Sequence, residues 1–267
     1  MTDSLAILGL GFLLGMRHAT DADHVVAVTT IVARHRTFRD AAWIGISWGI
    51  GHSLTILAVG GGIVLFKWVI PPRLGLSMEL AVGIMLVVLG VATLRSIWRT
   101  RAPSVEPGPG GLVHSHAHGH GDFVHTHPHG HEPGRHSHPP DRTPVSWLDR
   151  HFGRLGVYRA TRPLVIGMVH GLAGSAAIAL LVLTTIGSPT WAAFYLLVFG
   201  VGTLIGMMVL TLALATPFVY SARRWQAISR GLAFGAGLLS VVLGLVVAYQ
   251  VGVAGGLFGA NPQWTPK

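Results

Sequence analysis

The stretch Arg17-His18-Ala19-Thr20-Asp21-Ala22-Asp23-His24 decides the fold, because it places charged and imidazole groups in the middle of an apolar segment. Apolar residues flank it over positions 5–16 and 25–32, so the segment exceeds the about 20 residues that a transmembrane helix needs. An Arg or Asp that faces lipid at the centre of a helix costs roughly 2.5 kcal/mol or more. These groups therefore need partners inside a helical bundle, and ionisable residues at this depth usually serve function.

The composition also indicates a membrane protein. Of the 267 residues, 51% are hydrophobic and 11% are charged, whereas a soluble domain usually carries about 25% charged residues. The formal net charge is +9, but the basic residues lie at the ends of apolar segments, so membrane topology explains them better than nucleic-acid binding does. The chain contains no cysteine, so a metal ion must be held by imidazole, carboxylate or backbone oxygen.

We predict an all-α polytopic membrane protein with six transmembrane helices. Their expected ranges are 5–32, 41–66, 77–97, 164–186, 191–215 and 231–255. The polar stretch 99–162 separates the third and fourth helices, and its Pro, Gly and His content predicts disorder through residue 140. A short interfacial helix is expected over 145–158. The loop divides the chain into a first three-helix unit at 1–98 and a second at 163–267.

The two halves resemble each other at three places, in the same order and at nearly constant separation. The matching pairs are Gly15-Met16-Arg17-His18 with Gly167-Met168-Val169-His170, Trp48-Gly49-Ile50-Gly51 with Phe199-Gly200-Val201-Gly202, and Val87-Val88-Leu89-Gly90 with Val241-Val242-Leu243-Gly244. Because each half holds three spans, the second half crosses the membrane in the opposite sense. This 3+3 inverted-topology repeat is typical of secondary transporters, whose substrate site lies near the midplane. The alternative is chance similarity among apolar helices.

Basic residues predict the orientation of the bundle. Most of them lie in the connections after the first, third and fifth spans, whereas the other side holds only Lys67, Arg73 and Lys267. Cytoplasmic loops carry the excess of Lys and Arg. We therefore expect the His-rich loop to be cytoplasmic and both termini to face outward. The protein would lie in a bacterial-type inner (plasma) membrane, with the lipid bilayer as one of its partners.

Helical geometry brings part of the opening stretch together. At about 100° per residue, a continuous helix places His18, Asp21 and His24 within an arc of about 120°. Asp23 falls outside that arc, so either the helix loosens here or Asp23 orients an imidazole from behind the ligands. Two imidazoles and a carboxylate form a partial site for Ni, Co or Zn. The alternative is a buried salt-bridge network between Arg17 and the two aspartates.

Two further histidines lie near the middle of other spans. His52 can add an imidazole at similar depth, and the neighbouring glycines Gly49 and Gly51 allow close backbone approach. His170 mirrors His18 in the repeat, and the roles of ligand, gate and hydrogen-bonded core residue stay open for it. Arg17 and Ser53, next to expected ligands, are candidates for charge tuning or gating.

The loop between the two units is rich in histidine. Its alternating members are His114, His116, His118, His120, His125, His127, His129 and His131. A flexible chain with this alternation can bring several imidazoles around one ion, which suits Ni, Co, Cu or Zn with low selectivity. We expect this loop to bind metal for buffering, sensing or donation, and the alternative is a neutral polar linker.

These residues resemble a known family. The run from Arg17 to Val25 closely resembles the signature of the nickel/cobalt transporter family, NiCoT, within the broader NicO group, and Gly51-His52-Ser53 resembles its second signature. The resemblance implies transport of Ni²⁺ or Co²⁺, with the first-motif His and Asp residues and the following His needed for metal selection. Typical uptake members have an eight-span design, from which this chain departs. The sequence around His170 looks like the urease-accessory-type branch, and the internal His-rich loop looks like the efflux branch.

We therefore expect a secondary transporter with no permanent cofactor and no enzymatic activity. Its cargo would be Ni²⁺ or Co²⁺, with Zn²⁺ as an alternative, bound at the midplane to His18, Asp21, His24 and His52. No P-loop motif occurs, so coupling would use an ion gradient or a partner protein. Two other functions stay open. One is an accessory that delivers nickel for metalloenzyme maturation, with a cytosolic metallochaperone as partner, and the other is a membrane metalloenzyme, which would need an open coordination position.

Overall fold

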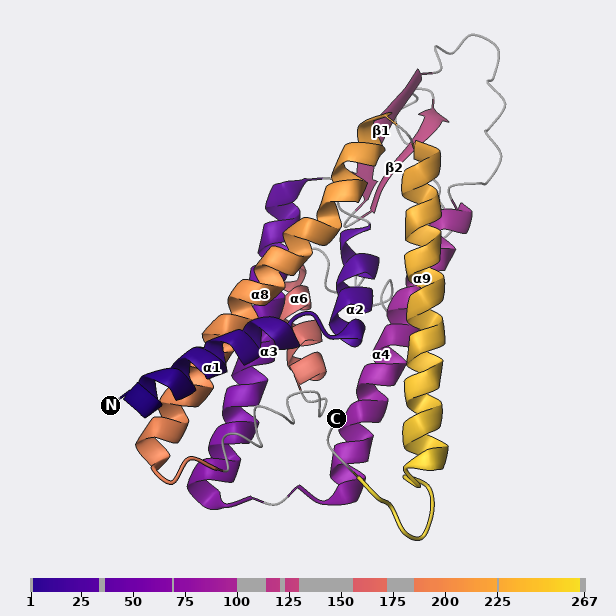
Figure 1. Cartoon of the computed structure of the whole chain (residues 1–267). Helices are drawn as coiled ribbons and strands as arrows, with labels where there is room; N and C mark the ends of the chain where they lie inside the picture. The colour runs from indigo at the N-terminus through magenta and orange to yellow at the C-terminus, as the bar shows by residue number, and fades with distance from the viewer. Residues whose placement is uncertain are drawn as a thin grey trace.

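The structure, a computed structural model, is a bundle of helices that carries a small hairpin at one end (Figure 1). It describes residues 2–33, 37–68, 70–99, 114–120, 123–129, 156–171, 185–224 and 226–264. Its elements are α1 (Thr2–His18), α2 (Ala22–Val32), α3 (Phe38–Phe66), α4 (Pro72–Arg99), β1 (His114–His120), β2 (Phe123–His129), α6 (Gly156–Gly171), α8 (Pro189–Arg224), α9 (Gln226–Tyr249) and the π-helical turn η2 (Gln250–Ala254).

The distribution of side chains is that of a protein in lipid. Among the described residues, four helices are long and apolar enough to cross a membrane, and they are Phe38–Phe66, Pro72–Trp98, Pro189–Tyr220 and Ala227–Ala254. Large apolar side chains such as Leu13 and Leu65 are 64% and 68% exposed, whereas four histidines are among the buried polar residues. Lipid solvates exposed apolar surface, while ionisable groups at this depth turn to the interior of the bundle. The chain is therefore a polytopic, helical, integral membrane protein.

The first predicted span, 5–32, consists of two helices rather than one. α1 ends at His18, and a turn over residues 19–21 precedes α2. The backbone N–H groups of Thr20 and Asp21 donate to the carbonyls of Arg17 and His18, at 2.9 and 3.1 Å. These shorter-range bonds close the last turn of α1, and Asp21 takes an extended conformation as the N-cap of α2. The expectation of one continuous helix is wrong here.

The other predicted spans are helical where the structure describes them. α3, α4, α8 and α9 contain the ranges 41–66, 77–97 and 191–215 and most of 231–255, with α8 extending well beyond its prediction. α6 begins at Gly156, before the predicted start at 164. The remainder of that span, 172–184, lies outside the described residues. The predicted interfacial helix over 145–158 lies outside them as well, apart from 156–158, which open α6.

The loop predicted to be disordered contains an antiparallel hairpin. β1 pairs with β2 in a register that runs from His114↔His129 to His120↔Phe123. The sequence between the strands is Gly121-Asp122, which is typical of a two-residue hairpin connection, and the period of two along each strand suits a ladder. The prediction of disorder is therefore wrong for these residues, and the described part of the chain is helical apart from this hairpin.

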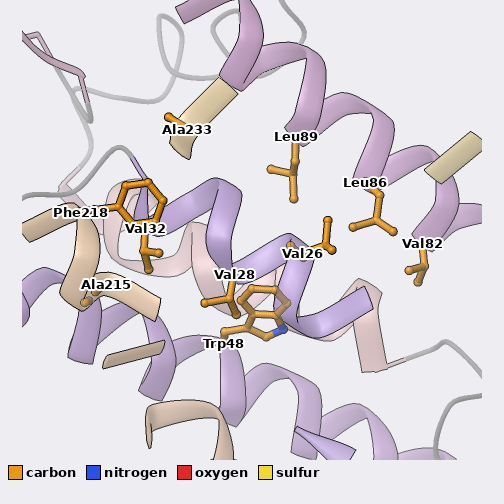
Figure 2. Packing of buried hydrophobic residues seen from close by; sticks show 12 residues of the cluster. Val26, Val28, Val32, Trp48, Val82, Leu86, Leu89, Ala215, Phe218 and Ala233 are labelled. Carbon is orange, nitrogen blue, oxygen red and sulfur yellow. The ribbon is translucent and has the colours of Figure 1, made fainter. Parts of the chain in front are cut away.

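Two apolar clusters pack the interior of the bundle. The larger joins residues of α2, α3, α4, α8 and α9, and includes Val28, Trp48, Leu86 and Phe218 (Figure 2). The smaller joins α3 and α8 through Ile56, Tyr195 and Phe199, with α1 packed against it. The chief helix pairs are α4 with α9, α3 with α8, α1 with α8 and α3 with α6. The two apolar clusters thus leave the C-terminal end of α1 and the middle of α3 for polar chemistry.

Candidate metal centre

The break between α1 and α2 places four functional groups of the opening stretch around one point. His18 is the last residue of α1, Asp21 caps α2, and Asp23 and His24 lie in its first turn. Broken helices at membrane depth are the usual way in which transporters present side chains and backbone dipoles to an ion. α1 packs against α8 and α2 against α4, α8 and α9, and the turn at Thr20 and Asp21 connects the two helices.

Three imidazoles form a nearly equilateral triangle at this point. The ring centroids of His18, His24 and His52 are 4.8, 5.0 and 4.9 Å apart for the pairs 18–24, 18–52 and 24–52. Each of the three side chains offers a ligand atom within 4.8 Å of the others, and all three residues are buried. The Nε2 atoms of His18 and His52 are 2.8 Å apart, which allows them to share one proton or to face one ion.

The two aspartates hold the imidazoles from behind. Asp21 Oδ2 lies 3.0 Å from Nδ1 of His18, and Asp23 Oδ1 lies 3.0 Å from Nδ1 of His24. When each Nδ1 carries the proton and donates it to the carboxylate, the Nε2 lone pair is free to coordinate a cation. This is the positioning contact that the sequence prediction offered for Asp23. It also gives Asp21 a partner in His18 rather than in Arg17.

His170 joins the centre from the end of α6. Its Nε2 lies 3.1 Å from Oδ2 of Asp23, the oxygen that His24 does not use. The rings of His170 and His24 are 4.2 Å apart between centroids, closer than any pair in the triangle. Asp23, His24 and His170 form a second group whose ligand atoms lie within 4.8 Å of one another. One carboxylate thus links imidazoles from the two halves of the chain.

Polar atoms without a hydrogen-bond partner gather at the same place. Among the described residues, the buried side-chain atoms of this kind are His24 Nε2, Trp48 Nε1, His52 Nδ1, His170 Nδ1 and Tyr195 OH. Three of them belong to the histidines of the centre. Buried polar groups are nearly always satisfied in native proteins, and exceptions concentrate where a ligand or ion binds.

Two buried aromatic residues border the histidines. Phe199 of α8 lies 5.7 Å from the ring of His18, and Trp48 of α3 lies 5.4 Å from the ring of His170. Trp48 and Phe199 are the first residues of the two matching glycine motifs, and neither was predicted to belong to the site. Their matching positions in the two halves were the signal that could have identified them.

The remaining predicted site residues stand apart from the two ligand groups. Arg17 is exposed on α1. The hydroxyl of Ser53 donates to the carbonyl of Gly200 at 3.0 Å, and so connects α3 with α8. In the hairpin, the register sets His114, His116 and His118 opposite His129, His127 and His125. His120 lies opposite Phe123, and His131 lies outside the described residues.

The arrangement can bind a divalent transition metal. Neutral imidazole suits nickel, cobalt and zinc, and a carboxylate that accepts a hydrogen bond from the ring of His18, His24 or His170 raises the basicity of that ring as a ligand. The two carboxylates also offset the charge of a dication beside the buried histidines. The described part of the centre thus contains imidazole and carboxylate, the two side-chain ligand types that we expected in a chain without cysteine.

Comparison with known proteins agrees with this chemistry. The family model of the high-affinity nickel-transport protein, NicO, matches residues 4–140. The urease accessory protein UreH of Bacillus sp. (strain TB-90) is 34% identical over 256 residues, which make up 96% of this chain and 96% of that protein. No solved structure matches the chain. The resemblance seen in the motifs of α1, α2 and α3 is thereby confirmed, and the chain belongs to the NicO family.

Proposed function

We propose that this protein is a secondary transporter of Ni²⁺ or Co²⁺, which binds within the cluster of His18, His24, His52 and His170. The observation that carries the proposal is the convergence of four buried imidazoles from both halves of the chain, three of which lie within hydrogen-bond distance of Asp21 or Asp23. Membership of the NicO family favours transport over the metalloenzyme alternative. Zn²⁺ fits the same ligands and is the competitor ion to include in any assay.

The 3+3 inverted repeat is part of this proposal, and reciprocal contacts support it. A Cβ at Gly15 would lie 2.2 Å from the carbonyl oxygen of Phe199, and one at its counterpart Gly167 would lie 2.2 Å from that of Trp48. Trp48 and Phe199 are themselves counterparts. α1 therefore approaches α8 in the way that α6 approaches α3, as two units related by a twofold axis in the membrane plane require.

Two further sets of glycines repeat the same exchange. A Cβ at Gly51 would lie 2.1 Å from the oxygen of Leu164, while one at Gly202 would lie 2.3 Å from that of Phe12. Between α4 and α9, a Cβ at Gly90 would meet the oxygen of Gly237, and one at Gly244 that of Gly83, each at 2.6 Å. Chance similarity among apolar helices predicts no such exchange of partners. Alternating access would then arise from movement between pseudo-symmetric parts around a fixed ion site.

The orientation follows from the charge distribution. The N-terminus and the loop after α9 lie away from the hairpin (Figure 1). The positive-inside rule then gives a cytoplasmic His-rich loop and outward termini, in a bacterial-type inner membrane. The domain limits 1–98, 99–162 and 163–267 fit this arrangement, in which the loop would hold metal ions on the cytoplasmic side of the transporter.

An accessory role in nickel delivery is a second candidate. The observation that favours it is the similarity to a protein named as a urease accessory protein, over nearly the whole of both chains. In this role the His-rich loop would pass nickel to a cytosolic metallochaperone. A delivery protein needs the loop for all of its function, whereas a transporter keeps vectorial flux without it.

The decisive experiment is radiometal flux in sealed, oriented vesicles. Wild type would be compared with His18→Ala, Asp21→Asn and a deletion of residues 113–138, each checked for membrane insertion. The transporter proposal expects flux from wild type and from the deletion variant, and strongly reduced flux from His18→Ala. Asp21→Asn should be affected less than His18→Ala, because Asp21 acts through His18. Unchanged flux in both point variants would remove the proposed site, and loss of flux on deletion would favour delivery.

A further inference from the structure

We propose that His18 and His170 are alternative ligands for one ion, which passes between two overlapping positions while His24 remains bound to it. The inference rests on the proposed function and assigns the part that His170 plays in it. The first position is formed by His18, His24 and His52, and the second by Asp23, His24 and His170. His24 is the residue that the two groups share.

The two positions border different apolar clusters. His18 contacts Phe199, which belongs to the smaller cluster, whereas His170 contacts Trp48, which belongs to the larger. The ring of His24 contacts both histidines, at 4.8 Å from the ring of His18 and 4.2 Å from that of His170 between centroids. An ion that exchanges His18 for His170 therefore leaves the neighbourhood of one aromatic residue and approaches that of the other.

Asp23 shortens the distance between the two exchanging positions. Its two oxygens contact Nδ1 of His24 and Nε2 of His170, so the carboxylate holds both rings at once. With the protons on those nitrogens, the free lone pairs are on His24 Nε2 and His170 Nδ1, the two atoms that have no hydrogen-bond partner. Those lone pairs are what an arriving cation requires. The ring of His52, 5.9 Å from that of His170, remains near enough to accompany the start of the movement.

The exchange step is a ligand substitution. The coordinate bond from the metal to His18 breaks and a bond to Nδ1 of His170 forms, while Asp23 keeps its hydrogen bonds to the rings of His24 and His170. No electron is transferred, and the oxidation state of the metal does not change. A path through two sites allows binding that is strong enough to admit the ion and still weak enough to release it, which one deep site does not. The relation of His18 to His170 in the repeat gives each half one of the two exchanging ligands.

The test uses the full-length protein in proteoliposomes and in nanodiscs, with Co²⁺ as the probe. We would measure Co²⁺ flux, Co²⁺ affinity and the visible absorption spectrum of bound Co²⁺ for wild type, His18→Gln and His170→Gln. Thr55→Val is the matched control, because Thr55 donates to Met168 of α6 across the same helix contact without belonging to either ligand group. His170→Asn replaces His170→Gln if the latter does not insert.

We expect His170→Gln to retain the wild-type affinity and spectrum, since the triangle of His18, His24 and His52 is intact, while its flux falls by about 10–100-fold. His18→Gln should lose flux and affinity together and show a changed spectrum. Thr55→Val should carry wild-type flux. Wild-type flux in His170→Gln, or an equal loss in Thr55→Val, would overturn the inference.

A second result would also overturn it. If His170→Gln and His18→Gln alter the Co²⁺ spectrum and affinity alike, all four histidines hold the ion together and no exchange occurs. Failure of the proposed function has a different signature, because wild type itself would then carry no Co²⁺ or Ni²⁺ flux. Flux in wild type with an unaffected His170→Gln removes the exchange alone and leaves transport standing.

Discussion

The bundle centre and the His-rich hairpin contain the same residue type in two different settings. In the centre, four histidines come from α1, α2, α3 and α6, and each is buried. In the hairpin, seven histidines fall within the two adjacent strands β1 and β2, and six of them face one another in register. The first set depends on the tertiary fold, whereas the second depends on a local period of two.

The difference teaches what burial adds to a ligand. A buried imidazole that lacks its partner costs free energy, so the centre favours an ion that satisfies its buried nitrogens. The carboxylate partners of His18, His24 and His170 also fix which nitrogen of those three rings is available. A run of alternating histidines lacks this constraint, so it suits the binding of many metal ions rather than selection of one kind of metal ion. The following predictions test that contrast, starting with the largest effect.

His24→Ala should have the largest effect, because His24 belongs to both ligand groups. We expect loss of metal affinity beyond the ~100-fold that loss of an outer partner can cause, with no measurable transport. Isothermal titration with Ni²⁺ in detergent would give the affinity, and vesicle flux the activity. A matched substitution in the hairpin, His116→Ala, should leave both nearly unchanged. Equal effects of the two substitutions would abolish the distinction between the regions.

Asp23→Asn should have the second largest effect. The amide keeps the shape of the side chain but loses the charge that holds His24 and His170. We expect affinity for Ni²⁺ to fall by about 10–100-fold, the range for partners that orient a metal ligand. The measurement is the same titration, with Asp40→Asn as control, since Asp40 is exposed near the start of α3. A wild-type affinity would show that Asp23 does not orient the ligands.

Gly51→Ala should weaken the fold around the centre. Its Cβ would lie 2.1 Å from the carbonyl oxygen of Leu164, so α6 must move away from α3 and carry His170 with it. Overpacking typically costs 1–3 kcal/mol, which should appear as a lower melting temperature in detergent. Gly61→Ala, in the same helix with open space around its Cβ, should not lower it. Equal melting temperatures for the two variants would contradict the close approach of α3 and α6.

Deletion of residues 114–129 should have the smallest effect on transport. The connection between α4 and α6 stays long, and even a doubling of loop length changes the closure free energy by only about 0.6 kcal/mol. We expect flux near the wild-type level, together with fewer metal ions bound per chain in equilibrium dialysis. Unchanged stoichiometry would mean that the hairpin histidines bind no metal, and lost flux would favour the delivery role over transport.

Part of this architecture could be predicted from sequence and part could not. The apolar segments predicted the membrane helices. The free-energy cost of placing ionisable side chains within a membrane pointed to the stretch that holds His18 and His24. Helical spacing then grouped both histidines with Asp21, which does contact His18. For Asp23 the spacing left two alternatives, a loosened helix or a carboxylate that orients an imidazole, and gave no position. That position depends on backbone hydrogen bonds at residues 19–21 and on His170, which is far away in sequence.

The hairpin and the aromatic neighbours were missed for different reasons. The alternation of histidines reads as low complexity by composition, but the same period of two supports a strand ladder once a tight connection is available. Trp48 and Phe199 are apolar residues in apolar helices, and only their contacts with His170 and His18 distinguish them from ordinary core residues. Composition carries no information on such contacts.

The interruption after α1 has a mechanical consequence. α1 lies along α8, whereas α2 packs against α4, α8 and α9. Among the described residues, the α4–α9 pair contacts α2 and also α8 and α6. Asp23 and His24 open α2, so they lie at one of the connections between this pair and the other helices. A tilt of the α4–α9 pair would act on the shared ligand through α2, and an ion held there would in turn resist the tilt.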